Sequence, residues 1–416
     1  METINELKSK IHKIFRPGTT VLERKYLVGR EQEIKDLEKV LSRHGEHAII
    51  IGDRGVGKTS LVRIVLKELG QKYYDRTLNT HKTTFESLFK SLLNDAGIDL
   101  DITEDEKVSK STSEIKGGIK VIGGKIASEK TFSEKHSYNN SALNPWDVYK
   151  YLKNKDKIIF VLDEYDAIHD MANEDEIRSS TAYTLKTISD HASDCESKII
   201  IVGVARSSHE LIGKHLSIER CLKELFLRQL KKQHVLDFLE IAEEEIGISF
   251  DNRVKTEIVE NSLGYPYFVH LVSLESIESM FERDINDRNI TWQDYERGFE
   301  KASKQAFQAE LSKYKSTVET ALPSEKAFIY LLASSSRYPI NRKTLKNLIP
   351  KNEKELFDNY DLIMNTLIIE KRLLHLSTTT DELRFVDPLL RPFLKSYARL
   401  NTKTDNTPTL FDDSFE

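Results

Sequence analysis

The chain has 416 residues, of which 39% are hydrophobic and 31% are charged, and its formal net charge is -5 at pH 7. This length allows two or three domains, and the overall charge gives nucleic-acid phosphates no bulk attraction. The two cysteines are too few for a disulfide framework, and no zinc-type spacing is present. Because the N-terminus lacks the apolar region of a signal peptide and no stretch approaches about 18 apolar residues, we expect a cytoplasmic protein without a membrane span.

The first elements in chain order are an arm and a helix. Residues 1–25 are expected to form a polar N-terminal arm. Residues 28–31 read Val-Gly-Arg-Glu and come directly before a predicted helix. The apolar face of this helix is made by Ile34, Leu37, Val40 and Leu41.

A strand, a loop and a helix follow over residues 48–69. Residues 48–51 read as a short buried strand, and residues 60–69 carry apolar side chains at helical spacing. The residues between them fit the complete phosphate-binding pattern G-x-x-x-x-G-K-T. In such a loop Lys58 can reach the β- and γ-phosphates of a nucleotide, and the Thr59 hydroxyl can ligate Mg²⁺. We therefore predict that a nucleotide is bound by Gly52, Asp53, Arg54, Gly55, Val56, Gly57, Lys58, Thr59 and Ser60.

A second strand supports this prediction. After a polar insertion over residues 99–141, which reads as a hairpin or a flap, residues 157–162 form an apolar run that ends at Asp163 and Glu164. An apolar strand ending in two acids is the Walker B pattern, in which the first carboxylate holds the metal shell and the second polarises water for attack on the γ-phosphate. We therefore assign Asp163 to the Mg²⁺ shell and Glu164 to the role of general base.

The remaining core elements are a helix over residues 179–191 and a buried strand over residues 198–204. Strands that alternate with helices imply right-handed crossovers and a mostly parallel sheet. The sequence therefore predicts the α/β class, with a P-loop αβα core over residues 26–228.

Two further domains are expected after the core. Residues 229–322 show only helical patterns and predict a helical lid, in which Thr291 caps a long helix. Over residues 323–400, three helical stretches (residues 325–333, 341–348 and 355–367) precede a hairpin from residues 373–376 to 383–386, which predicts a C-terminal winged helix. The polar tail, residues 401–416, is expected to be disordered.

Several of these motifs together resemble a known family. They are the Val-Gly-Arg-Glu run at 28–31, the acids Asp163 and Glu164, the segment 215–220, the Gly-Tyr-Pro run at 264–266 and the winged helix. In this order they look like an AAA+ P-loop ATPase, of the bacterial branch that resembles origin-recognition ATPases and STAND NTPases. The resemblance implies ATP and Mg²⁺ as ligands and a nucleotide held between core and lid.

The resemblance also implies roles for single residues. Arg220 resembles the arginine that such ATPases insert into a neighbour's site, where it acts in catalysis beside Glu164 and Lys58. Pro266 is similar to the lid proline that packs against adenine and ribose. Arg206 or Ser207 stands where a sensor residue is usual. The lid helix after Pro266 lacks the family's sensor arginine, which favours slow, switch-like hydrolysis.

The process that the ATP cycle controls stays open at this stage. We favour a switch that self-assembles or engages a protein effector when it is loaded with ATP. The alternatives are a DNA-binding initiator or transposition-type ATPase, and an ATPase subunit of a bacterial defence system. The predicted recognition helix, residues 353–361, is acidic and would repel DNA phosphates, whereas Arg337, Arg342, Lys343 and Lys346 offer a basic edge.

Overall fold

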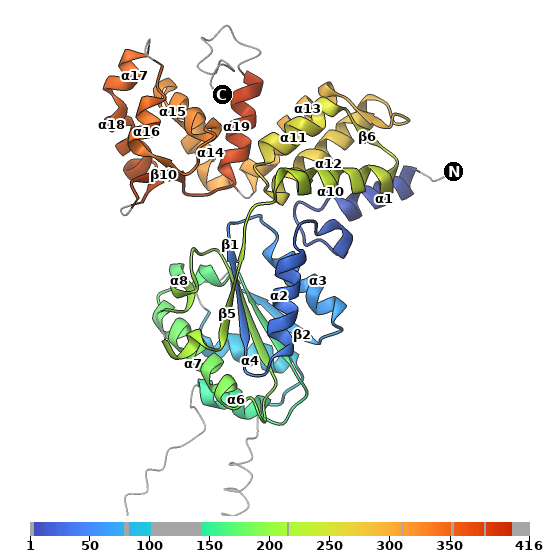
Figure 1. Ribbon diagram of the computed structural model, residues 1–416, viewed down its shortest axis with the longest axis vertical. Coiled ribbons are helices and arrows are strands. Elements are labelled where there is room, and N and C mark those ends of the chain that lie inside the picture. Colours follow the sequence, from blue (N-terminus) through green and yellow to red (C-terminus); the bar gives the residue numbers. More distant parts are fainter. Residues whose placement is uncertain are drawn as a thin grey trace, which may run out of the picture. The chain divides into compact units, whose positions relative to one another are not determined.

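The computed structural model describes residues 4–78, 83–100, 143–213, 216–309, 311–350, 353–377 and 380–401. The chain divides into two compact units (Figure 1). The first, which we call the loop–lid unit, comprises Met1–Glu31, Gly52–Ile64 and Leu227–Glu416; the second, the sheet unit, comprises Gln32–Ile51 and Val65–Phe226. From residue 101 on, the predicted insertion lies outside the described residues, as does the tail after residue 401. The domain limits given above remain predictions.

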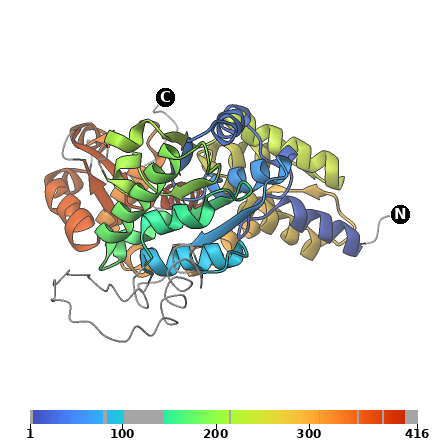
Figure 2. The same cartoon turned by 90° about the horizontal axis from the view of Figure 1, so that it is seen from below.

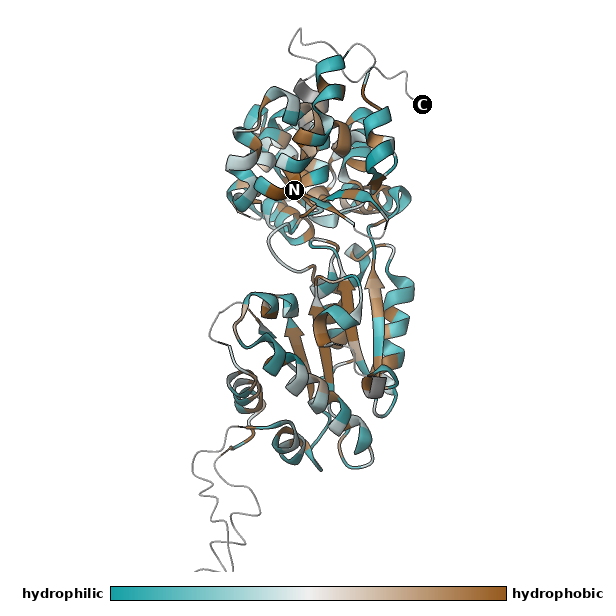
Figure 3. Ribbon diagram, turned by 90° about the vertical axis from the view of Figure 1, so that its left-hand side faces the viewer, coloured by the Kyte–Doolittle hydropathy of each residue, from teal (hydrophilic) through white to brown (hydrophobic). Residues whose placement is uncertain are grey.

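The sheet unit is built on five strands in the order β2-β3-β4-β1-β5. The pairs β1 with β4, β4 with β3 and β3 with β2 are parallel. Continuous apolar runs suit strands that are buried on both faces, and β1, β3 and β4 are buried throughout. Figure 3 shows the strands of this sheet mostly in the brown of hydrophobic residues. This confirms the predicted α/β class. The strands are β1 His47–Gly52, β2 Tyr73–Thr77, β3 Ile159–Asp163, β4 Lys198–Gly203 and β5 Leu222–Leu227.

Helices cover both faces of this sheet. Alternate residues of β1 and β4, such as Ile49 and Ile199, join one core cluster with side chains from α4, α6 and α7. The ribbons of these helices are drawn from below in Figure 2. On the other side of the sheet lies α2 (Figure 1). The helices that lie wholly or partly in the sheet unit are α2 Glu31–Ser42, α3 Lys58–Glu68, α4 Phe85–Asp95, α6 Pro145–Leu152, α7 Glu174–Asp190, α8 Ser208–Ile212 and α9 Leu216–Glu219, with the short helix η3 Tyr165–Asp170. The short helix η1, Arg24–Tyr26, belongs to the loop–lid unit.

The predicted polar arm is wrong for its first part, which forms a helix with a buried face. Helix α1, Ile4–Ile14, buries Leu7, Ile11 and Ile14 and packs on α10. Its apolar residues recur at helical spacing, but the many charged residues between them hide the pattern. The ring of Phe15, the residue that follows, lies 5.5 Å from that of Phe238. The arm is therefore an integral part of the loop–lid unit.

Helices dominate the region predicted as the lid, but the expectation that it is wholly helical is wrong. The short strands β6 and β7 pair in parallel, with Ser249 opposite Asn289 and Phe250 opposite Ile290. Strands of this length are too short to show an alternating pattern in the sequence. The elements are α10 Lys232–Ile246, β6 Ser249–Phe250, α11 Asn252–Ser262, α12 Pro266–Arg283, β7 Asn289–Ile290, α13 Trp292–Gln308 and α14 Ser312–Glu319.

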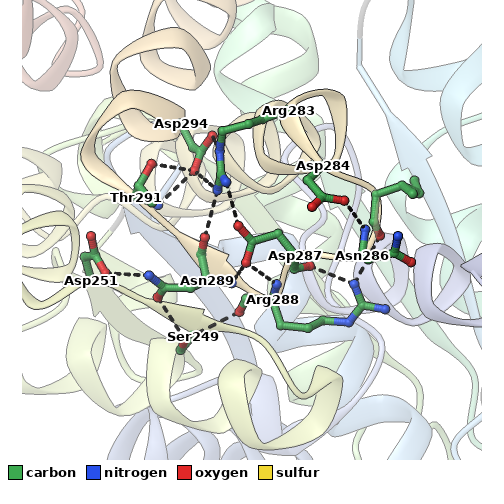
Figure 4. A network of polar contacts seen from close by, with 11 residues as sticks. Ser249, Asp251, Arg283, Asp284, Asn286, Asp287, Arg288, Asn289, Thr291 and Asp294 are labelled. Carbon is green, nitrogen blue, oxygen red and sulfur yellow. Dashed lines mark hydrogen bonds and ion pairs between the residues drawn. The ribbon is translucent and has the colours of Figure 1, made fainter.

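A polar network holds the turn between α12 and α13 (Figure 4). The guanidinium of Arg283 donates to both carboxylate oxygens of Asp294, at 2.9 and 2.7 Å, and to the carbonyl oxygen of Asn289 at 3.1 Å. Thr291 caps α13 in a capping box with Asp294, which confirms the predicted helix start. The network thus joins the end of one lid helix to the start of the next.

The C-terminal part of the loop–lid unit confirms the predicted hairpin, since β9 and β10 pair antiparallel and β8 extends their sheet. The helix predicted over residues 355–367 is instead broken at Asn359. The assignment as a winged helix stays a prediction. The elements are α15 Pro323–Ser334, β8 Ile340–Asn341, α16 Arg342–Asn347, α17 Lys354–Asp358, α18 Tyr360–Asn365, η4 Thr366–Glu370, β9 Leu374–Leu376, β10 Glu382–Phe385 and α19 Leu390–Asn401. Among the described helices, none is both long and apolar enough to span a bilayer.

Stability should fall as the pH drops below about 6.5, because burial lowers the pKa of His270 to about 4. The unfolded chain then binds a proton that the folded chain excludes, so the free energy of unfolding should decrease by roughly 2 kcal/mol between pH 7 and pH 5 through this residue. Urea unfolding of a His270→Gln variant should show a pH dependence weaker by about that amount. An unchanged pH dependence in His270→Gln would contradict the assignment.

Candidate nucleotide-binding site

The predicted phosphate loop lies between β1 and α3. Gly57 has a φ of +96°, and a Cβ placed there would meet no atom within 4 Å. Glycine is the residue that adopts this conformation readily, so the backbone can turn its N–H groups toward an open side. A loop of this kind at a helix N-terminus fits an anion such as the phosphates of a nucleotide.

Lys58 lies against this loop. Its ammonium donates to the carbonyl oxygens of Gly52 at 3.0 Å and of Asp53 at 2.8 Å. These bonds keep the positive charge beside the loop backbone, where it can neutralise phosphate charge. Thr59 follows in the first turn of α3. The Ser60 hydroxyl accepts a bond from the backbone N–H of Val21 at 3.2 Å, so its side chain faces the N-terminal arm.

Arg30, the arginine of the Val-Gly-Arg-Glu run, also contacts the phosphate loop. Its side chain is buried, and its guanidinium donates to the carbonyl oxygens of Val56 at 3.0 Å and of Arg228 at 2.7 Å. It therefore joins the phosphate loop to the segment that leads into the lid. Sequence reasoning placed Arg30 in a family motif but gave it no role.

In the sheet unit, β3 ends at the predicted acidic pair. Asp163 is buried, and one of its carboxylate oxygens accepts the backbone N–H of Glu164 at 2.9 Å. Glu164 itself has a φ of +50°, in the left-handed region. This conformation costs a residue with a Cβ roughly 1–2 kcal/mol, and such strain gathers at functional sites. A functional role for Glu164 is compatible with this strain.

The strand order places the carboxyl ends of β1 and β3 at the same edge of the sheet. In the register, Ile51 of β1 is opposite Gly203 of β4, and Leu162 of β3 is opposite Ile201. The strands β1 and β3 thus flank β4 and run in the same direction. Ligands of open parallel sheets bind at the carboxyl ends of the strands, where the phosphate loop and the acidic pair begin. Asp166 braces this edge by accepting the backbone N–H of Val204 at 2.8 Å.

The donor set suits a magnesium ion that is shared with phosphates. Magnesium is usually bound through one or two carboxylates, substrate phosphates and water, and seldom by a cage of protein groups. Asp163 offers one carboxylate in the sheet unit, and Thr59 offers one hydroxyl in the loop–lid unit. Among the described residues, no group of three or more His, Cys, Asp and Glu side chains could hold a metal.

The remaining predicted site residues lie in different surroundings. The side chain of Arg220 is 69% exposed and donates to Asp190 at 2.7 Å. A hydrogen bond from Lys186 lowers the pKa of Asp190, and the contact with Arg220 lowers it further. Arg206 and Ser207 precede α8, and Pro266 begins α12. The described contacts do not test the roles predicted for these residues.

The sequence does not predict the contacts of the Asp53 side chain. Its carboxylate accepts bonds from the Tyr265 hydroxyl at 2.8 Å and from the Gln229 amide at 2.5 Å. Tyr265 stands in the Gly-Tyr-Pro run, which could have drawn attention to it, but the sequence carries no signal for Gln229. The phosphate loop therefore has direct contacts to the base of the lid within the loop–lid unit.

Known proteins with similar folds are ATPases and origin-recognition proteins. The Walker-type ATPase of Pyrococcus abyssi is 16% identical, with a TM-score of 0.53 over 92% of this chain and 99% of that chain. The Aeropyrum pernix ORC1 protein, solved in complex with DNA, is 16% identical, with a TM-score of 0.46 over 93% and 97%. The ORC2 protein of the same organism, solved in ADPNP–ADP complexes, is 13% identical, with a TM-score of 0.47 over 94% and 98%. At these identities the similarity to the Pyrococcus protein shows a shared fold.

A search of curated proteins finds no significant match. A family model matches residues 27–272, which is more than half of the chain and includes the phosphate loop, the acidic pair and the base of the lid. The described geometry and this match agree on a P-loop ATPase. The chain belongs to the family of ATPase domains found predominantly in Archaea.

Proposed function

We propose that the protein binds ATP with Mg²⁺, hydrolyses it slowly, and acts as a switch that assembles with further copies or engages a protein partner while ATP is bound. The phosphate loop carries the binding step, since the Lys58 ammonium is held on the loop's own carbonyl oxygens. In this proposal Gly52 to Ser60 contact the phosphates, and Pro266 packs against the nucleoside. Thr59 and Asp163 hold Mg²⁺, which supplies charge neutralisation at the β- and γ-phosphates.

Glu164 is the proposed general base. Its carboxylate takes a proton from the attacking water, so that the oxygen can form a bond to the γ-phosphorus as the bond to the leaving phosphate oxygen breaks. The left-handed backbone at Glu164, directly after Asp163, is the observation that best supports this role.

Slow hydrolysis is inferred from the first turn of α12. After Pro266 this turn reads Tyr-Phe-Val-His, without an arginine, and its histidine is buried against the arm. The lid's first turn therefore supplies no cation to the developing phosphate charge. We infer that Arg220 of a second copy supplies it, because a planar guanidinium suits phosphate and this side chain is largely exposed.

A protein partner is favoured over DNA by the exposed face of α17, α18 and η4. Phe357, Leu362 and Ile369 are 45%, 67% and 68% exposed. In the sequence, each of them is followed or preceded directly by an exposed acidic residue: Asp358, Asp361 and Glu370. Carboxylates repel DNA phosphates, whereas a mixture of apolar and acidic side chains is complementary to a basic, apolar protein surface.

The trans-acting arginine is tested by an Arg220→Ala variant. We expect wild-type ATP affinity and a loss of hydrolysis of about 1,000-fold. An arginine inserted by a neighbouring molecule raises the rate of phosphoryl transfer by at least about that factor. Mixing Arg220→Ala with Glu164→Gln should restore part of the activity, since each variant keeps the half of the interface that the other lacks. Phosphate release should be measured for each variant alone and for the mixture, alongside the mass in ATP and in ADP by light scattering.

The matched control is Lys186→Ala, which removes the other cation on Asp190, at 2.6 Å. If Arg220 only pairs with Asp190, both variants should behave alike. Wild-type hydrolysis by Arg220→Ala, or a mass that is the same in ATP and in ADP, would contradict the assembling switch.

A further inference from the structure

The phosphate loop is joined to the lid base by three side chains of different chemistry. The carboxylate of Asp53 accepts bonds from the hydroxyl of Tyr265 and from the side-chain amide of Gln229. The same amide nitrogen lies 2.8 Å from the Tyr265 hydroxyl oxygen. A primary amide carries two N–H groups, so it can serve both acceptors at once. The carboxylate is thus held by two neutral donors.

The lid side of this contact is built independently of Asp53. Leu230, next to Gln229, donates its backbone N–H to the carbonyl oxygen of Gly264, next to Tyr265, at 2.8 Å. Gly264 has a φ of +76°, and a Cβ there would lie 2.1 Å from the carbonyl oxygen of Leu230. Only glycine permits this approach of the two backbones. Gln229 and Tyr265 are therefore placed side by side by the backbone itself.

The direction of the Tyr265 bond is fixed. The side chain is 5% exposed, and burial together with the negative charge of Asp53 raises the pKa of Tyr265. The phenol therefore keeps its proton over the physiological pH range and donates it to the carboxylate. A phenylalanine at this position would fill the same space and lose only the donor.

Asp53 links this contact to the phosphate-binding lysine. Its side chain is held by the lid base, while its carbonyl oxygen accepts a bond from the Lys58 ammonium at 2.8 Å. Two neighbouring bonds reinforce the joint: Tyr267 donates its backbone N–H to Gly55 at 3.4 Å, and Arg30 bridges Val56 and Arg228. A shift of the lid base would therefore move the residue that positions Lys58.

We propose that Asp53, Tyr265 and Gln229 form a latch through which the lid sets the position of Lys58, so that nucleotide binding at the loop and the conformation of the lid base are coupled. This inference rests on the proposed ATP binding. Coupling between two sites is reciprocal, so ATP stabilises the lid base to the extent that the lid base strengthens ATP binding. Asp53 and its two partners are positioning residues that act through Lys58.

The latch is tested with variants that remove or keep its hydrogen bonds. Tyr265→Phe and Asp53→Leu break the latch, whereas Asp53→Asn keeps an acceptor for Tyr265 and a side-chain amide that can pair with Gln229 after rotation. The matched control is Tyr360→Phe, which removes a buried phenol that donates to the carbonyl oxygen of Arg342 at 2.7 Å. Two quantities are measured for each full-length variant: the Kd for ATP by calorimetry, and the ATP-induced protection of amides 264–268 in hydrogen exchange.

We expect Tyr265→Phe and Asp53→Leu each to weaken ATP binding about 10-fold and to lose most of the ATP-induced protection at the lid base. The double variant should bind ATP no more weakly than Asp53→Leu alone, because Asp53→Leu already removes the bond that Tyr265→Phe removes. Asp53→Asn should weaken ATP binding less than Asp53→Leu does, and Tyr360→Phe should match the wild type. Should Asp53→Leu fail to fold, Tyr265→Phe and Gln229→Ala provide the same comparison.

Three outcomes would overturn the latch. In the first, Tyr265→Phe has the Kd for ATP and the ATP-induced amide protection of the wild type. In the second, the effects of Tyr265→Phe and Asp53→Leu on the Kd add fully in the double variant. In the third, Asp53→Leu is impaired but Tyr265→Phe is not, which would show that Asp53 acts only within the phosphate loop. In each case wild-type ATP binding persists and the proposed function stands. If the wild type itself binds no ATP, the proposed function fails and the latch fails with it.

Discussion

Replacing Glu164 by glutamine should leave ATP bound and lower phosphate release by about 100- to 10,000-fold, the range that general base catalysis contributes. Glutamine keeps the size and polarity of the side chain but cannot take a proton from water. Asp163 and Lys58, which we assign to metal and phosphate binding, are unchanged, so the ATP affinity should stay close to the wild-type value. The measurement is phosphate release at saturating ATP, with ATP affinity from calorimetry.

A second substitution at the same position separates chemistry from backbone strain. Glycine adopts a φ of +50° without the steric cost that a Cβ imposes, so Glu164→Gly should lose hydrolysis while its core is no less stable than that of the wild type. Glu196→Gln, an exposed carboxylate of the same unit, serves as the control and should hydrolyse ATP normally. Wild-type phosphate release from Glu164→Gln would show that the general base lies elsewhere.

Replacing Lys58 by alanine should weaken ATP binding by at least about 100-fold, because charge-assisted hydrogen bonds to the phosphates are lost. The core should stay folded, since the hydrogen bonds described for Lys58 go to carbonyl oxygens of its own loop. Calorimetry with ATP measures the effect, and circular dichroism checks the fold.

The control for this variant is Lys67→Ala, an exposed lysine in the last turn of the same helix, α3. It removes the same charge from the chain at a position away from the phosphate loop, so its ATP affinity should match the wild type. An unchanged ATP affinity in a folded Lys58→Ala variant would contradict the assignment of the site.

The central strands and the phosphate loop could be predicted from the sequence because their signals are local. β1, β3 and β4 are uninterrupted apolar runs, and the loop's pattern stands between a strand and a helix. The capping box of α13, formed by Thr291 and Asp294, is local as well. Such signals depend on neighbours within a few residues, which a sequence displays directly.

The edge strands and the first helix carry weaker signals. β2 is only partly buried and contains Asp75 and Arg76, so it lacks the apolar run of a central strand. β5 alternates buried and exposed residues over a short length. In α1 the helical spacing of Leu7, Ile11 and Ile14 is present, but the charged residues around it make the segment read as a polar arm.

Several features of the site depend on tertiary contacts and could not be predicted. Asp53, Gln229 and Tyr265 are far apart in the sequence and meet only because Gly264 packs on Leu230. Arg30 likewise meets Val56 and Arg228 only in the folded chain. The left-handed backbone of Glu164 is a further example, because a glutamate at this position does not predict a positive φ.

The chemical state of the bound nucleotide tests the central claim most directly. The protein is incubated with ATP and Mg²⁺, separated from free nucleotide, and its bound ATP and ADP are quantified over time for the wild type, Lys58→Ala and Glu164→Gln. The account predicts that bound ATP turns into ADP in the wild type, stays ATP in Glu164→Gln, and is missing from Lys58→Ala. ATP that stays intact on the wild type, or that turns into ADP equally fast on Glu164→Gln, would contradict it.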